Sequence, residues 1–235
     1  MFYSLRSEVV EAIRDYKYLL NRGYPQKASL DFVSANYRLT QAERALLLRC
    51  VHRDSDSEAI RRKTVRDLSR LELVIDGYNV ILTVVSAIEG LQLFLCDDGF
   101  IRDLRSSYVK DFKTPKIMEA IKYLVKAIDI LNTKHIFVVL DKNVSWSAEH
   151  ADFMKSTYGI DVVTAAKADI AVIGSGKVIS SSDFVILLKS EKVYDLAQFV
   201  VRNMVSNTEI IELWNAFSRS HSDSKLPPAK TDESI

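Results

Sequence analysis

The sequence predicts an α/β protein in which a parallel sheet is flanked by helices and preceded by a small all-helical domain. From residue 71 onward, short apolar runs alternate with segments of helical period, which is typical of βαβ units. These runs are apolar on both faces, as strands are when helices cover both sides of a parallel sheet. The first 70 residues show only the helical period. With 235 residues, 48% of them hydrophobic, the chain can bury such a core.

The helical domain is expected over residues 1–70. One apolar stripe ends before Gly23 and Pro25 and consists of Val9, Val10, Ile13, Tyr16, Leu19 and Leu20. Thr40 and Glu43 have the spacing of a capping box, which predicts a further helix start. The charged segment 52–70 is expected to be an exposed connector that becomes a basic helix, so we place the domain boundary near residue 70.

The α/β domain is expected over residues 71–217. Apolar runs predict strands at 73–75, 91–96, 135–140, 162–163 and 178–180. One helix is predicted to reach Ser86, and another to begin at Thr114 and Pro115, a cap followed by a first-turn proline. Residues 218–235 contain few apolar side chains, and we expect them to form a disordered tail.

Cysteine usage and hydropathy predict a cytoplasmic protein. Cys50 and Cys96 have no zinc-type spacing, so both are expected to be small buried residues in a reducing compartment. No apolar run is long enough to cross a bilayer, so no membrane partner is expected.

The net charge of +1 conceals an uneven distribution. Residues 1–70 hold 14 Lys and Arg against 9 Asp and Glu, whereas residues 71–235 hold 18 against 22. A basic front suits a polyanion and an acidic rear suits a divalent metal. Chance unevenness of surface charge is an equally good account.

Aspartates recur at the ends of the predicted strands. Asp76 ends LELVID, Asp98 ends LQLFLCDD and Asp141 ends HIFVVLD. In an open α/β sheet these strand ends share the edge where ligands bind. Asp169 and Asp183 hold comparable positions later in the chain. Converging carboxylates repel one another unless a hard cation with oxygen ligands lies between them, so the pattern predicts a Mg²⁺ or Mn²⁺ site.

Each aspartate is also open to a purely structural interpretation. Asp76 before Gly77 is compatible with a turn, and the segment 97–99 with a hairpin turn. Asp169 and Asp183 are compatible with helix caps. The structural interpretations weaken when the set is taken together, because Ser, Thr and Asn cap helices equally well.

The stretch VIDGYNVILT resembles the opening strand and turn of the NYN branch of the PIN-like nucleases. The segments FVVLD, AKAD and SSSD follow in the order that this superfamily uses, so the resemblance covers roughly residues 71–200. It implies a PIN-like (Rossmannoid) sheet. The whole chain also resembles an archaeal family of uncharacterised proteins with an N-terminal helical domain and a PIN-like domain.

The resemblance implies a Mg²⁺- or Mn²⁺-dependent ribonuclease that attacks single-stranded or structured RNA with a metal-activated water. Asp76 is implied to bind metal from the first strand, and Asn79 to steady the turn around it. Asp141 is implied to add a ligand from the central strand. Asp169 and Asp183 are implied to complete the catalytic set.

The segment DDGFIRDLR departs from the ordinary NYN pattern and is open to three interpretations. Asp98 is a candidate fifth metal ligand. Alternatively, Arg102 and Arg105 hold a phosphate while Asp103 orients an arginine. The third interpretation is a solvated, salt-bridged turn.

Two residues after Asp141 are candidates for contacting substrate. Lys142 is a candidate for a phosphate contact, although exposed lysines are common. Trp146 is a candidate for stacking on an unpaired base, or for packing under its own loop.

Two functions of other classes compete with the ribonuclease. One is a catalytically inactive PIN-like protein that binds nucleic acid or acts as a scaffold. The other is a metal-dependent phosphohydrolase of a small substrate, although such enzymes more often carry a DxD pattern where this chain has DGYN. The helical front is open to three roles: an RNA-holding module, the dimerisation element of a homodimer, or a lid.

Overall fold

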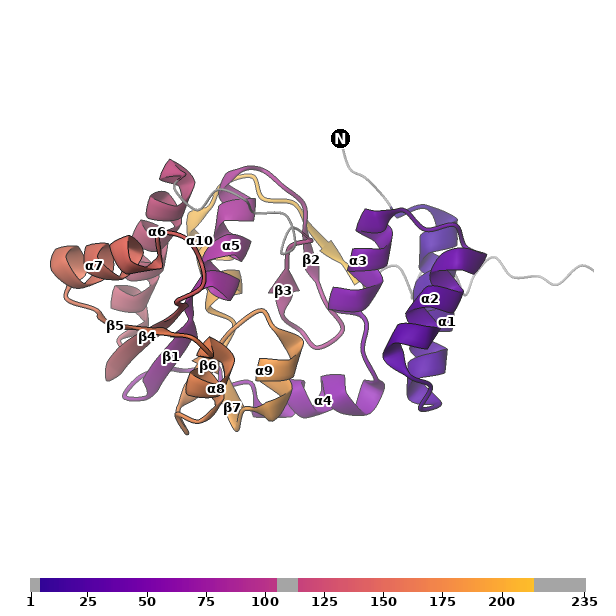
Figure 1. The fold of residues 1–235 in the computed structure, drawn as a ribbon, viewed down its shortest axis with the longest axis horizontal. Helices are drawn as coiled ribbons and strands as arrows, with labels where there is room; N and C mark the ends of the chain where they lie inside the picture. The colour runs from indigo at the N-terminus through magenta and orange to yellow at the C-terminus, as the bar shows by residue number, and fades with distance from the viewer. Residues whose placement is uncertain (1–4, 105–113, 214–235) are drawn as a thin grey trace, which may run out of the picture.

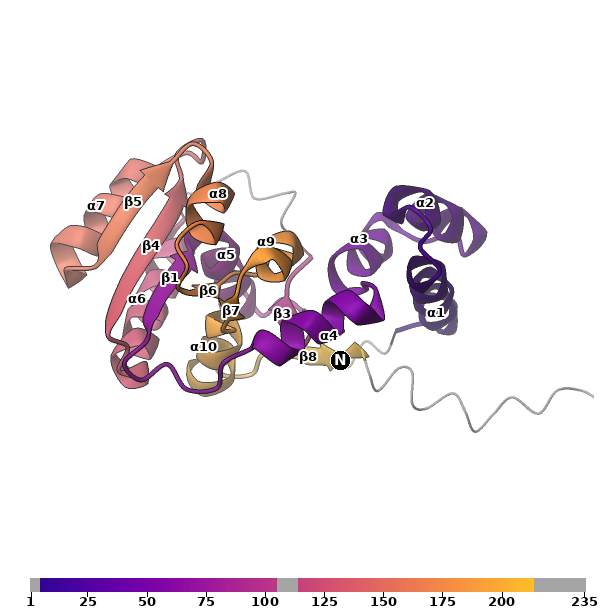
Figure 2. The same ribbon diagram turned by 90° about the horizontal axis from the view of Figure 1, so that it is seen from below.

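The computed structural model describes residues 5–104 and 114–213 (Figure 1). Arg105 and the expected tail at 218–235 lie outside these residues. A helical front occupies one end of the molecule, a five-stranded sheet occupies the other, and a smaller sheet stands between them (Figures 1 and 2). None of the helices in the described ranges is long and apolar enough to span a membrane.

The helical front consists of α1 Ser7–Asn21, α2 Gln26–Asn36, α3 Gln41–Cys50 and α4 Asp54–Lys63. The capping box at the start of α3 is confirmed. The Glu43 amide donates to Thr40 Oγ1 at 3.3 Å, and the Thr40 amide donates to Glu43 Oε2 at 2.7 Å. α4 has acidic residues in its first turn and basic ones in its last, which is the favourable arrangement in the field of the helix dipole.

The main sheet is parallel throughout, with the order β5-β4-β1-β6-β7. Its strands are β1 Glu72–Asp76, β4 His135–Asp141, β5 Asp161–Ala165, β6 Val178–Ser180 and β7 Lys192–Val193. The helices are α5 Gly77–Ile88, α6 Pro115–Leu131, α7 Ser147–Tyr158, α8 Ala168–Ile173, α9 Phe184–Lys189 and α10 Leu196–Met204. The expected α/β class, with a parallel sheet flanked by helices and a helical region before it, is therefore confirmed.

Alternation along β1 divides the core into two layers. Leu73 and Ile75 face the larger cluster, which contains side chains of α5, α6, α7 and α10. Val74 faces a smaller cluster on the other side, with side chains of α8 and α9. Both faces of the strand are therefore apolar, as the sequence predicted.

The connections reverse direction between β1 and β6. From β1 the chain proceeds outward to β4 and β5, then returns to the opposite side of β1 to form β6 and β7. Ile75 pairs with Ser180 across this junction. α5 follows β1 on one face and α9 follows β6 on the other, so the carboxyl ends of these two strands flank the switch point where open α/β sheets bind ligands.

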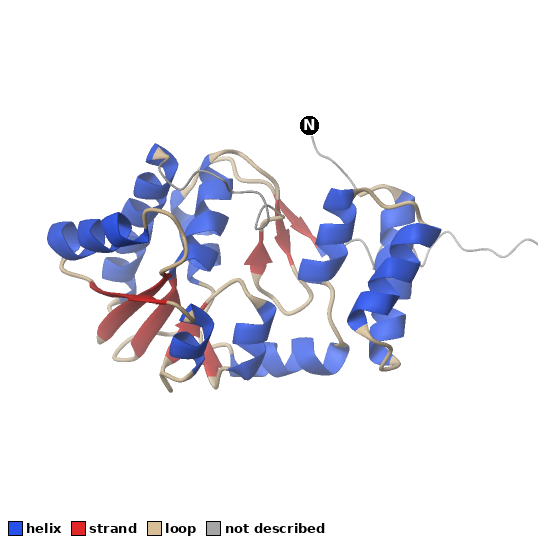
Figure 3. Cartoon of the chain, in the orientation of Figure 1, coloured by secondary structure: helices blue, strands red, loops and turns tan. Residues whose placement is uncertain are grey.

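The expectation that the strand before Asp97 and Asp98 joins the main sheet is wrong. β2 Leu93–Leu95 lies in a separate sheet of order β3-β2-β8, with β3 Ile101–Arg102 and β8 Ile210–Glu212 (Figure 3). Phe94 and Cys96 pack into the core of the helical front. A short apolar run is buried equally well by either sheet, so its pattern did not indicate its partner.

Gly77, the first residue of α5, has no room for a side chain. A Cβ there would collide with a methyl group of Leu140 and lie 3.1 Å from the carbonyl oxygen of Val139. We expect Gly77→Ala to lower the free energy of unfolding by about 1–3 kcal/mol because β4 must shift. Urea denaturation measures it. Gly174→Ala is the control, since its tightest contact is with one carbonyl oxygen at a helix end. An equal loss in both variants would contradict the close approach of the start of α5 to β4.

Candidate functional site

Asp76 lies at the carboxyl end of β1, beside the switch point. Its side chain is 5% exposed, and one oxygen, Oδ2, accepts two hydrogen bonds. Ser181 Oγ donates at 2.6 Å and Asn79 Nδ2 at 2.7 Å. The contact that the resemblance implied for Asn79 is thus present. Both donors are neutral, and among the described residues no Lys, Arg or His pairs with Asp76.

Burial raises the pKa of Asp76 to about 6. The hydrogen bonds from Ser181 and Asn79 act in the opposite direction, while the charges of Asp183 and Asp169 raise the pKa further. A buried carboxylate that feels two other carboxylates and has no cation beside it is costly to ionise. A bound cation would remove that cost.

Asp183 lies beyond the end of β6 and caps α9. Its Oδ1 accepts from the amides of Val185 at 2.7 Å and Ile186 at 3.0 Å, and its own amide donates to Ser181 Oγ at 2.9 Å. The cap that the sequence offered as an alternative is therefore formed. It occupies Oδ1, and no described donor reaches Oδ2.

Asp141 and Asp169 occupy the neighbouring strand end and helix. Val139 of β4 pairs with Asp76, so Asp141 lies two residues further along β4, toward the same edge. Its Oδ1 accepts from the amide and the side chain of Asn143 at 2.8 and 3.0 Å. Asp169 is exposed in the first turn of α8. All four carboxylates therefore lie around the carboxyl edge of the sheet.

The oxygen donors fit Mg²⁺ or Mn²⁺ in type, but they do not form a closed cage. Among the described residues, no three Asp, Glu, His or Cys side chains are grouped so as to hold a metal ion. Mg²⁺ characteristically keeps several waters and binds one or two carboxylates, so Asp76 with one neighbour is a sufficient donor set.

Asp98 and Arg102 form a buried ion pair, which corrects their expected roles. Nη1 of Arg102 donates to Oδ1 of Asp98 at 2.9 Å, Nη2 donates to Oδ2, and Nε donates to the carbonyl oxygen of Ser182 at 2.7 Å. The two side chains are 0% and 1% exposed, so the turn is not solvated either. Asp98 is committed to a cation, and Arg102 is committed to Asp98. Asp103 is also buried and accepts from Thr83 Oγ1 at 3.1 Å.

The candidate substrate contacts flank Asp141. Lys142 is exposed on the loop after β4. Trp146 stands immediately before α7 with φ of 69° and is 40% exposed. Both residues are exposed near the carboxyl end of β4, where Asp141 lies. Their roles as substrate contacts remain predictions.

The sequence did not indicate Ser181, or the residues that bind Asp97, as parts of a site. Ser181 follows β6 directly, and only its place after a strand that neighbours β1 would have indicated it. Asp97 accepts from Lys17 Nζ at 2.8 Å, from the His52 amide at 2.6 Å and from His52 Nδ1 at 2.8 Å. The turn at 97–99 joins β2 to the antiparallel β3, which confirms the hairpin alternative.

Two family profiles match the chain in tandem. Residues 65–199 match the family described as a domain of unknown function (DUF5616), and residues 8–63 match one described as a protein of unknown function (DUF434). The chain is also similar to an uncharacterised protein of Methanocaldococcus jannaschii, with 31% identity over 191 residues, or 79% of this chain and 91% of that protein. No solved structure matches.

The raised pKa of Asp76 predicts a pH-dependent stability in the presence of chelator. Its folded pKa of about 6 exceeds the unfolded value of about 3.9, so its contribution is fully present below pH 4 and is lost as pH rises through 6. We expect the stability of wild type relative to Asp76→Asn to fall by on the order of 2–3 kcal/mol across this window. Thermal melts at pH 4 and pH 7.5 measure it. A constant difference between the two proteins would exclude a buried, unpaired Asp76.

A second substitution separates structural carboxylates from candidate ligands. Asp98→Asn leaves the guanidinium of Arg102 buried without an anion, and we expect a loss of about 3–5 kcal/mol in the free energy of unfolding. Denaturant titration measures this loss, with the exposed Asp129→Asn as the control. If Asp98→Asn melted normally but lost Mn²⁺ affinity, Asp98 would be a ligand after all.

Proposed function

The chain belongs to the family described as a domain of unknown function (DUF5616), and from its site we propose that it is a metal-dependent ribonuclease of the PIN/NYN-like type. The observation that carries the proposal is the state of Asp76. It is buried at the switch point, it is held by neutral donors, and two further carboxylates raise its pKa. A site of this kind is suited to a divalent cation.

The sequence pattern around Asp76 supports the nuclease assignment. The DGYN turn supplies Asn79, which donates to Asp76, and the later acidic segments follow in the superfamily order. Asp141 ends β4 and Asp183 follows β6, and these are the two strands that flank β1. The carboxylates thus come from three adjacent strand ends, where a ligand of an α/β sheet is expected.

Each residue has a distinct part in the proposed reaction. Asp76 and Asp141 hold the ion, and Asp183 is able to use Oδ2, which its capping role leaves open. When bound, Mg²⁺ or Mn²⁺ supplies a water of lowered pKa and offsets charge on the leaving oxygen. Asp169 orients that water or acts as a ligand through it. Ser181 and Asn79 fix the rotamer of Asp76.

Substrate contacts are proposed for the loop after β4. Lys142 contacts a phosphate and Trp146 stacks on an unpaired base of single-stranded or looped RNA. We place this activity in the cytoplasm, because Cys50 and Cys96 are both free thiols buried in the core of the helical front.

One observation favours a second candidate function. The described Asp, Glu, His and Cys residues contain no cluster of three that is ready to hold a metal. A PIN-like protein that binds RNA without cutting it would need none. The small-substrate phosphohydrolase has no comparable support.

The direct test is cleavage of labelled RNAs, both structured and single-stranded, with Mn²⁺, with Mg²⁺ and with chelator. We expect metal-dependent products from wild type and a loss of on the order of 100-fold or more in Asp76→Asn and Asp141→Asn, because each removes a ligand charge. Asp161→Asn is the matched control, since this exposed carboxylate begins β5 at the opposite edge of the sheet.

Three results would decide between the candidates. Products that persist in both site variants would point to a contaminating nuclease. RNA binding without cleavage, and without Mn²⁺ binding by calorimetry, would favour the inactive binding protein. Hydrolysis of p-nitrophenyl phosphate with intact RNA would favour the phosphohydrolase.

A role of the helical front in RNA affinity is best tested by surface substitution. Removing residues 1–70 would expose Phe94, Cys96 and Leu213, which share a core with α1 and α3. Such a truncation would therefore confuse a loss of binding with a loss of folding.

A further inference from the structure

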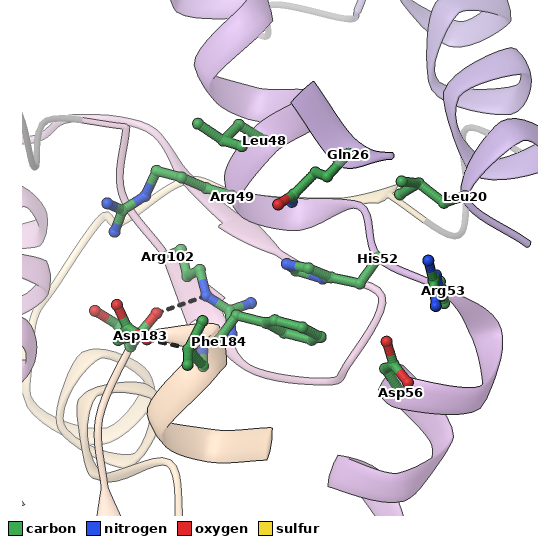
Figure 4. A pocket seen from close by; sticks show the side chains of 12 residues that line it. Leu20, Gln26, Leu48, Arg49, His52, Arg53, Asp56, Arg102, Asp183 and Phe184 are labelled. Carbon is green, nitrogen blue, oxygen red and sulfur yellow. Dashed lines mark hydrogen bonds between the residues drawn. The ribbon is translucent and has the colours of Figure 1, made fainter. Parts of the chain in front are cut away.

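A pocket of about 440 Å³ lies between the helical front and the start of α9. Figure 4 shows that its lining comes from both parts of the chain. The helical front contributes Arg49, His52 and Arg53, and the α/β part contributes Ser182, Asp183 and Phe184. The pocket is therefore adjacent to the Asp76 site, with Asp183 belonging to both.

His52 is the organising residue of this pocket. It is 3% exposed, and its ring stacks on Phe184 with centroids 3.5 Å apart and planes 3° from parallel. Its Nδ1 lies 2.8 Å from Oδ1 of Asp97. Its Nε2 is buried and has no hydrogen-bond partner in the described structure. Buried ring nitrogens are normally paired, so an unpaired one in the wall of a pocket points to a ligand.

The charge of Asp97 determines what Nε2 is able to do. Burial alone would raise the pKa of Asp97, but the hydrogen bond and charge of His52, together with Lys17, keep that pKa below its usual value. The carboxylate is thus ionised and accepts a hydrogen bond from Nδ1–H of His52. Nε2 then accepts a hydrogen bond when the ring is neutral and donates one when it is protonated. A phosphate that keeps a proton suits both states, whereas an ionised phosphodiester suits the protonated ring.

The charged groups around the pocket favour an anion near His52. Arg53 is exposed and has no ion-pair partner in the described structure. Arg102 is already neutralised by Asp98. Two lining residues are acidic: Asp183, which accepts two backbone amides, and Asp56, which lies in the first turn of α4, where the helix dipole offsets negative charge.

We propose that this pocket binds a phosphate group, which accepts a hydrogen bond from Arg53 and is hydrogen-bonded to Nε2 of His52. Guanidinium groups match the geometry of phosphate oxygens, and the volume admits more than a bare ion, so the phosphate is able to carry a nucleoside or a chain. The phosphate site stands on the pocket alone. Its identification as an RNA phosphate rests on the proposed ribonuclease function. In that case a second phosphate of the same RNA strand lies near Asp76.

The test uses the full chain in chelator, with inorganic phosphate as the first probe. We expect calorimetry to detect binding, and the ¹⁵N signal of His52 Nε2 to shift as phosphate is added. Arg53→Gln should weaken binding by roughly tenfold, the size expected for one charged hydrogen bond. His52→Asn should weaken it comparably, because the asparagine amide keeps a donor toward Asp97 but has no counterpart of Nε2.

Arg62→Gln is the matched control. Arg62 lies on α4 with a side chain that is 78% exposed, and it does not line the pocket, so phosphate affinity should be unchanged. Undetectable binding by wild type, or equal affinity in wild type and Arg53→Gln, would overturn the proposal. An equal loss of phosphate affinity in Arg62→Gln would also overturn the proposal, because the loss would then reflect the net charge of the protein and not a contact in the pocket. Arg53→Gln keeps the test valid even if His52→Asn fails to fold.

The source of the phosphate is tested with an RNA of one sequence, prepared with and without a 5′-phosphate. The Asp76→Asn variant is used as the protein, so that the RNA is not cleaved. A gain in affinity from the 5′-phosphate that disappears in Arg53→Gln identifies a terminal phosphate. Equal dependence of both RNAs on Arg53 identifies an internal one, and either result supports the site. Phosphate binding without any nuclease activity would leave this proposal standing and remove the proposed function.

Discussion

The loop from Asp97 to Arg102 holds the two halves of the molecule together through buried charge. Asp97 gathers Lys17 of α1 and His52 before α4, while the Asp98 and Arg102 pair extends to the Ser182 carbonyl after β6. Charges removed from water are tolerated only when their partners are in place. This loop therefore sets the distance between the helical front and the switch point, and the pocket lined by His52 exists because of it.

Much of the fold followed from patterns that report burial. The strands β1, β4, β5 and β6 were predicted because their residues are apolar on both faces, and α3 because Thr40 and Glu43 reciprocate hydrogen bonds. The apolar pattern of residues 91–96 did not predict that β2 pairs with β8. Periodicity shows which faces of a strand are apolar, but it does not show which strand lies beside it. β8 itself, Ile210–Glu212, is too short to show any period.

The site was accessible to sequence reasoning only in part. Asp76, Asp141 and Asp183 were indicated because strand ends share an edge, and the structure places all three at that edge. Ser181 was missed because a serine in a run of serines carries no distinctive signal. Asp98 was misassigned because a carboxylate that binds a metal and one that binds a buried guanidinium look identical in sequence. Burial and pairing, which decide between them, are properties of the fold.

The shared core of the helical front and the small sheet has a consequence for biosynthesis. Leu213 and Ile211, near the end of the described chain, pack against the helices formed by the first fifty residues. The amino-terminal helices emerge from the ribosome first and pack against one another, yet the part of their core that Leu213 covers stays open until residues 211–213 have been made. Domains that fold as units during synthesis do not wait in this way. The helical front therefore completes its core only after residues 211–213 have left the ribosome, and until then part of its apolar surface stays exposed.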